Sequence, residues 1–104
     1  MLTPSTHLAN SVSWPALDPA AQAEQENLLT NTYVAAMREL APDMGAYQNE
    51  ADANEPNFQQ AFWGDNYARL LEIKREVDPG DVFWCAPCVG NERWEEVGDL
   101  LCRI

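Results

Sequence analysis

The sequence predicts an α+β fold with one long helix, two shorter helices, short strands and a flexible N-terminal head. Three observations support this prediction: an Asp-Pro helix start at residue 18, two amphipathic stretches separated by a glycine between residues 57 and 77, and short extended-type runs after residues 45 and 81. A chain of 104 residues has room for one small domain at most. We divide it into a head (1–17), a helix (18–42) and a C-terminal segment (43–104).

The head contains proline, serine and threonine without apolar periodicity, a composition that indicates flexible chain. It also lacks the basic and apolar regions of a secretory signal. We therefore expect no signal peptide in this chain.

Residues 18–42 carry strong helix signals. Asp18 can cap the first turn with its side chain, and Pro19 suits the first helical position. Pro42 ends the helix because proline cannot continue the backbone hydrogen bonding. Between them, apolar residues recur at the spacing of one helix face, which we interpret as a packing face: Leu29, Tyr33, Met37 and Leu40.

The segment that follows predicts a strand and two helices. Ala46–Glu50 has the alternation of a short strand. Phe58–Trp63 is predicted as a short helix that stops at Gly64. Asp65 is the expected cap of a second helix, which runs to Val77 and carries a wide apolar stripe.

Beyond Val77, a turn and a further strand are predicted. Asp78–Asp81 reads Asp-Pro-Gly-Asp, in which proline presets the first turn position and glycine tolerates positive φ. Val82–Trp84 is then a short strand, and residues 89–104 form an acidic, amphipathic stretch around Trp94.

Composition and charge exclude two classes of partner. The net charge of −11 predicts repulsion of nucleic acid phosphates and of anionic lipid, so we expect no binding to nucleic acid or to a membrane surface. No run approaches the roughly 20 apolar residues of a membrane span.

Three cysteines lie in the last twenty positions, and their pairing is open. Cys85 and Cys88 have the spacing of a redox dithiol or of half a zinc site, and Cys102 is a third candidate ligand. A structural disulfide between Cys85 and Cys102 is the main alternative. Because the only histidine, His7, lies far away in the head, we predict no metal site.

Three stretches, in this order and spacing, carry a family resemblance: GAYQNEAD (45–52), FWGDNYARL (62–70) and IKREVDP (73–79), the last followed by Val82 and Phe83. Together they resemble the C-terminal, berberine-bridge segment of the vanillyl-alcohol-oxidase (VAO) superfamily of FAD-dependent oxidoreductases. The resemblance covers about Leu40 to Cys102, and the tail VGNERW (89–94) is similar to the fungal branch.

The resemblance implies that this chain is an incomplete, C-terminal piece of a VAO-type FAD-binding domain. In the family, an N-terminal half binds FAD together with this segment, and a middle domain supplies the substrate pocket. FAD would therefore be bound mainly by a missing domain or by an FAD-binding partner chain, and the substrate would be a small molecule.

The resemblance also implies site residues. In relatives, the pattern of Tyr47 and Asn49 lies beside the flavin ring, and a strand would place both side chains on one face. Asn49 can donate and accept hydrogen bonds there without carrying charge. The next position is a second tyrosine in several alcohol-oxidising members and is Glu50 here; a partly buried carboxylate could serve as a general base.

Two functional hypotheses follow. In the first, the chain is the C-terminal part or small subunit of an FAD-dependent oxidoreductase, active only with an FAD-binding chain, in a pathway to a secondary metabolite. The alternative is a non-catalytic truncated remnant or a partner-binding protein. A remnant should tolerate loss of Tyr47 and Asn49, whereas a working subunit should not.

Overall fold

The structure is a computed structural model that describes residues 6–104. The part of the predicted head before Thr6 lies outside the described residues. The chain divides into two compact units, one that ends at Asn57 and one that comprises Phe58–Ile104. No helix of the described part is long and apolar enough to cross a membrane.

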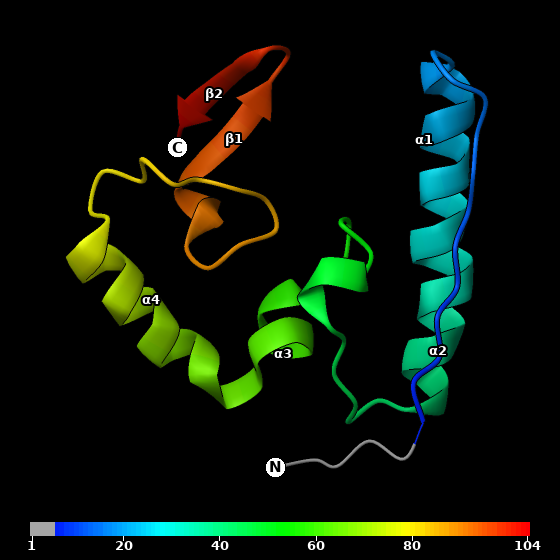
Figure 1. The fold of residues 1–104 in the computed structure, drawn as a ribbon, viewed down its shortest axis with the longest axis horizontal. Helices are drawn as coiled ribbons and strands as arrows, with labels where there is room; N and C mark the ends of the chain where they lie inside the picture. The colour runs from blue at the N-terminus through cyan, green and yellow to red at the C-terminus, as the bar shows by residue number, and fades with distance from the viewer. Residues whose placement is uncertain (1–5) are drawn as a thin grey trace. The chain divides into compact units, whose positions relative to one another are not determined.

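The first unit contains the predicted long helix (Figure 1). It comprises α1 (Pro19–Leu28), a π-helical segment η1 (Leu29–Val34) and α2 (Ala35–Leu40). As predicted, Pro19 opens it and the Asp18 carboxylate caps it, accepting the Ala21 N–H at 3.0 Å. In Figure 1, residues 6–17 have no helix or strand, and their blue trace runs opposite in direction to α1.

An ion pair holds the chain that follows this helix. Arg38 on α2 donates to the Glu55 carboxylate at 2.7 Å, and only 5% of the Glu55 side chain is exposed. The same guanidinium reaches the Thr30 carbonyl at 3.5 Å. The second Glu55 oxygen accepts the Asn57 N–H at 3.1 Å. Residues 41–57 are thereby fixed to the helix by charge-assisted hydrogen bonds.

The predicted strand Ala46–Glu50 is wrong. Tyr47 is extended, but Gln48–Glu50 form a 3-10 turn, η2, in which the Glu50 N–H binds the Tyr47 carbonyl at 3.0 Å. A strand needs a neighbouring strand to satisfy its backbone groups. Within residues 6–104 the only sheet has two strands, which pair with each other, so these groups bond locally instead.

Helices in the second unit follow the prediction closely. The α3 helix spans Phe58–Trp63 and ends at Gly64, whose φ of 53° is the left-handed conformation that glycine adopts readily. A short 3-10 turn, η3 (Gly64–Asn66), leads into α4 (Tyr67–Val77). Asp65 lies inside this turn and does not cap α4, because the helix begins one residue later than predicted and its N-cap position is Asn66.

After α4 the predicted turn is present and the predicted strand Val82–Trp84 is absent. The Asp81 N–H binds the Asp78 carbonyl at 3.1 Å, which closes the Asp-Pro-Gly-Asp turn. The Asp78 carboxylate then accepts the N–H groups of Val82 and Phe83 at 2.9 and 3.0 Å. A strand would use these N–H groups to pair with a neighbouring strand. Because the Asp78 carboxylate binds them, the residues form a second turn.

A β-hairpin that the sequence analysis missed ends the chain. β1 (Trp94–Val97) pairs antiparallel with β2 (Leu100–Arg103), with Trp94 opposite Arg103. A 3-10 turn, η4 (Asn91–Arg93), precedes it. The fold class of helices with a small sheet is confirmed, although the strands lie elsewhere than predicted.

The disulfide joins Cys85 to Cys88, with their Cα atoms 5.4 Å apart, and Cys102 is a free thiol. The alternative pairing of Cys85 with Cys102 is therefore wrong. The two-residue spacing decides the outcome, because a turn at residues 86–87 brings the neighbouring thiols together.

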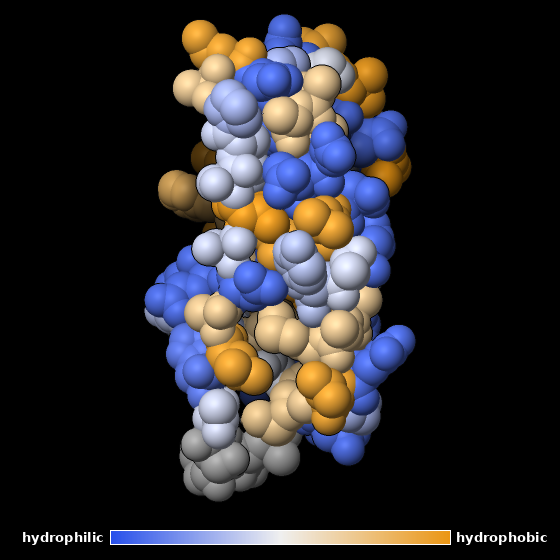
Figure 2. Space-filling model, turned by 90° about the vertical axis from the view of Figure 1, so that its right-hand side faces the viewer, coloured by the Kyte–Doolittle hydropathy of each residue, from blue (hydrophilic) through white to orange (hydrophobic). Residues whose placement is uncertain are grey.

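Apolar side chains are not sequestered within either unit. No hydrophobic residue among residues 6–104 is buried, and the buried polar residues are Thr30, Glu55, Asp78 and Asp81. Figure 2 shows apolar residues at the surface between hydrophilic ones. Polar contacts, more than an apolar core, therefore define the local structure.

The pKa values of Asp78 and Asp81 lie below the ordinary value of 3.8, chiefly because Lys74 hydrogen-bonds Asp78 and Trp94 hydrogen-bonds Asp81. A carboxyl group with a lower pKa in the folded state contributes stability above its unfolded value and loses it as the pH falls through the folded value. We expect α4 helicity, followed by circular dichroism, to be constant at higher pH and to fall below pH 3.8.

Asp78→Asn should lower the thermal midpoint at pH 7 and flatten this acid transition. Asp65→Asn, at an exposed position of η3, is the control and should titrate like the wild type. An acid transition unchanged in Asp78→Asn would contradict the assignment.

Candidate functional site

Tyr47 and Asn49 lie together as the sequence predicts, but a turn brings them together in place of a strand. Tyr47 has φ −78° and ψ 112°, and the η2 turn then folds the chain back. The Asn49 Nδ2 group donates to the Tyr47 hydroxyl at 2.6 Å. The Tyr47 side chain is largely exposed, so the pair forms a polar surface available to another molecule.

Glu50 lies beside this pair and is solvated. Its side chain is 60% exposed, and one carboxylate oxygen lies 3.7 Å from His7 Nε2. An exposed ion pair of this kind contributes little to stability. The desolvation that a carboxylate general base requires is not provided by this chain alone, because water reaches the group freely.

His7 is a site neighbour that the sequence analysis did not find. The sequence excludes it as a metal ligand because it lies in the head, far along the chain from the three cysteines. The structure brings His7 within ion-pair distance of Glu50. No local pattern signals this contact, since it depends on the path of the whole first unit.

The residues around Tyr47 suit the edge of a polar aromatic ring better than a phosphate. Asn49 and Tyr47 offer uncharged donors and acceptors. Glu50 and Asp52 add negative charge nearby, which repels phosphate oxygens. The site therefore offers uncharged hydrogen-bonding groups and lacks the donors that a phosphate needs.

A second polar cluster, unpredicted, lies in the second unit. The Tyr67 hydroxyl donates to Glu92 and accepts the Gly90 N–H at 3.1 Å, and Gln59 donates to the same Glu92 oxygen at 2.7 Å. The Tyr67 ring also contacts Trp63, with ring centroids 5.8 Å apart. The cluster ties α3 and α4 to the loop before the hairpin.

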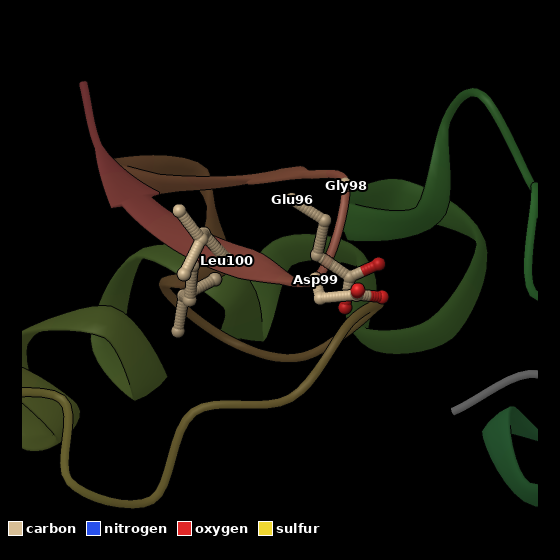
Figure 3. A pocket seen from close by; sticks show the side chains of 5 residues that line it. Glu96, Gly98, Asp99 and Leu100 are labelled. Carbon is tan, nitrogen blue, oxygen red and sulfur yellow. The ribbon is translucent and has the colours of Figure 1, made fainter.

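Figure 3 shows a shallow, open hollow at the turn of the hairpin. The carboxylates of Glu96 and Asp99 come to the same side of this turn, and Gly98, Leu100 and Leu101 complete the lining. Within residues 6–104 no group of three or more histidine, cysteine or acidic side chains is placed to hold a metal ion. We assign no ligand to this hollow.

Comparison with known proteins gives a consistent result. The family model described as "Berberine and berberine like" matches residues 46–90. The FAD-linked oxidoreductase sor8 of Hypocrea jecorina is 46% identical over 95 residues, which cover 89% of this chain and 17% of that protein. The FAD-linked oxidoreductase ZEB1 of Gibberella zeae is 38% identical and is matched over 93% of this chain and 18% of its own length.

Two solved structures share the fold. The VAO-type flavoprotein MtVAO713 of Myceliophthora thermophila is 39% identical, with a TM-score of 0.78 over 84% of this chain and 15% of that one. MtVAO615 of the same organism is 35% identical, with a TM-score of 0.79 over 88% of this chain and 17% of that one. This chain thus spans about one sixth of the length of the proteins it matches.

The Tyr67 cluster predicts an abnormal alkaline titration. Burial, followed by the hydrogen bond to Glu92, raises the pKa of Tyr67 from 10.0 to about 12. Because the folded value is raised, the stabilisation is complete below pH 10.0 and is lost as the pH rises through about 12. In an ultraviolet titration we expect a last phase near pH 12, which we assign to Tyr67.

Tyr67→Phe should remove this last phase, and Glu92→Gln should move it towards 10.0. Tyr33→Phe is the control and should keep it. Ionisation of all tyrosines near pH 10.0 in the folded protein would contradict the cluster.

Proposed function

We propose that this chain, whose residues 46–90 match the berberine-like family model, is the C-terminal part or a small subunit of an FAD-dependent oxidoreductase. The rest of the flavin site would come from an FAD-binding chain, and the substrate would be a small molecule. We also propose a role in making a secondary metabolite, which rests on the resemblance of residues 89–94 to the fungal branch of the family.

The Tyr47–Asn49 pair is the observation that carries this proposal. It lies inside the matched range, is exposed on the side of the tyrosine, and presents uncharged hydrogen-bonding groups. When bound, FAD would accept a hydride from a carbon next to oxygen or nitrogen. Asn49 would then bind the polar ring edge, and the Tyr47 hydroxyl would keep the amide oriented through their mutual hydrogen bond.

Glu50 would hold the proton released by the substrate hydroxyl. In this chain its carboxylate is solvated and lies near His7. An FAD-binding chain that covered η2 would exclude water from the carboxylate, and a desolvated carboxylate accepts a proton more readily. Glu50 would thus become competent only in the assembled site.

Two observations favour the alternative, a non-catalytic remnant or partner-binding protein. Many large apolar side chains of residues 6–104 are exposed, and Glu50 is solvated, as expected for a chain that binds a partner without forming an active site. Replacing Tyr47 and Asn49 separates the two hypotheses, because a working subunit would lose function and a remnant would not.

A chimaera gives the direct test. The matched segment of sor8 would be replaced by this chain, so that the remaining part of that oxidoreductase supplies the rest of the fold. We expect the purified chimaera to show the visible absorption bands of flavin, and Asn49→Ala to lose part of the flavin or shift its bands. A folded chimaera without flavin would favour the non-catalytic alternative.

Glu50→Gln in the flavin-loaded chimaera should lower turnover at least tenfold, the usual effect of losing a general base, and should flatten the pH profile of kcat. The control is Glu39→Gln, an exposed helical carboxylate outside the family match. Equal turnover in Glu50→Gln and wild type would remove Glu50 from the mechanism.

A further inference from the structure

The loop between α4 and the hairpin contains a disulfide that the proposed function does not use. Cys85 and Cys88 are three positions apart, and their Cα atoms lie 5.4 Å from each other. Cys85 is exposed, whereas Cys88 is partly buried. A reagent in solution therefore reaches the bond more easily from the side of Cys85.

This disulfide is poorly placed to stabilise the fold. A disulfide stabilises mainly by restricting the unfolded chain, and the effect grows with the number of residues in the closed loop. The bond between Cys85 and Cys88 closes a very short loop. A bond from either of them to Cys102 on β2 would close a longer one, yet Cys102 is a free thiol. The bond that forms is thus the one that contributes least to stability.

Hydrogen bonds hold the same loop without help from the sulfur atoms. The Cys88 N–H donates to Asn91 Oδ1, and the Asn91 N–H donates to the Cys88 carbonyl, both at 3.3 Å. The Asn91 carbonyl accepts Trp84 Nε1 at 3.2 Å. Asn91 therefore connects the residue before Cys85 with Cys88. These contacts would keep the two thiols close together after the disulfide is broken.

Gly90 fixes the loop to α4. Its φ is 81°, and a Cβ atom at this position would lie 3.1 Å from Leu71 Cδ1 and 3.4 Å from Lys74 Cγ. Glycine permits both the conformation and the close approach. The Gly90 N–H also donates to the Tyr67 hydroxyl at 3.1 Å. The position of the loop is therefore set by packing and hydrogen bonding on α4.

We propose that Cys85 and Cys88 form a reversible redox centre that undergoes thiol–disulfide exchange with a thiol reductant. The spacing is that of known redox dithiols, and exposed disulfides are the labile ones. A loop that keeps its shape in both redox states lets the bond form again without a search through other pairings. This activity is separate from flavin chemistry and does not depend on it.

The exchange proceeds through a mixed disulfide. A thiolate of the reductant attacks the sulfur of the exposed Cys85, and Cys88 leaves as a thiolate that takes a proton from water. A second thiolate then attacks the reductant's sulfur in the mixed disulfide, and Cys85 leaves and is protonated in the same way. The protein disulfide gains a pair of electrons and a pair of protons, and the reductant becomes a disulfide.

The first test counts thiols in the native chain. Dithiothreitol without denaturant should raise the number of reactive thiols from the one of Cys102 to all three cysteines. Glutathione disulfide, added after dithiothreitol is removed, should restore the original bond. Resistance to reduction without denaturant would overturn the proposal, as would reoxidation that pairs Cys102 with either partner.

A second measurement asks whether the loop survives reduction. Amide hydrogen exchange at Gly90, followed by NMR at neutral pH, should change by less than about twofold between the two redox states. Tyr67→Phe is the control, because it removes the hydrogen-bond acceptor and should speed this exchange while the disulfide stays intact. A disulfide that serves only to hold the loop would instead lose Gly90 protection on reduction, which would overturn the redox centre.

The attacked sulfur is assigned with single-cysteine chains in a Cys102→Ser background. Cys85, left free by Cys88→Ser, should react with glutathione disulfide several-fold faster than Cys88, left free by Cys85→Ser. Equal rates, or a faster Cys88, would overturn the mechanism. None of these readouts involves flavin, so their failure is distinguishable from failure of the proposed function.

Discussion

The structure of this chain is constrained by the lack of a buried apolar core within residues 6–104. Covering a leucine or phenylalanine side chain contributes about 1.5–3 kcal/mol, and this chain forgoes much of that contribution at its exposed apolar residues. Its elements are therefore fixed by charged hydrogen bonds at the junctions between them. Arg38 and Glu55 hold the segment after α2, and Lys74 and Asp78 hold the loop after α4.

Local signals explain why the helices could be predicted. Asp18 and Pro19 start α1, Gly64 ends α3, and the Asp-Pro-Gly-Asp turn follows α4. Each of these signals acts over a few residues, through a side-chain cap or a restricted φ. Such signals keep their effect whether or not the rest of a fold is present, and the bounds of α3 match the prediction for that reason.

Strands depend on distant partners, and here the sequence analysis failed. Ala46–Glu50 and Val82–Trp84 have strand-like composition but no neighbour to pair with among the described residues, so turns form. Trp94–Val97 and Leu100–Arg103 were read as an amphipathic acidic stretch, yet the short turn at Gly98 lets them pair with each other. Whether a neighbouring strand was available decided which segments became strands, more than the strand propensity of their residues did.

The candidate site shows the same division between local and distant determinants. The sequence predicted that Tyr47 and Asn49 share a face because they lie two positions apart. The η2 turn brings the two side chains into hydrogen-bond contact even though the expected strand is absent. The environment of Glu50 was not predictable, because burial depends on what covers the side chain. Within this chain water covers it, and the same carboxylate would have different chemistry under a second protein surface. The geometry of this site is thus set by the segment itself, whereas the reactivity of Glu50 would depend on the protein surface that covers it.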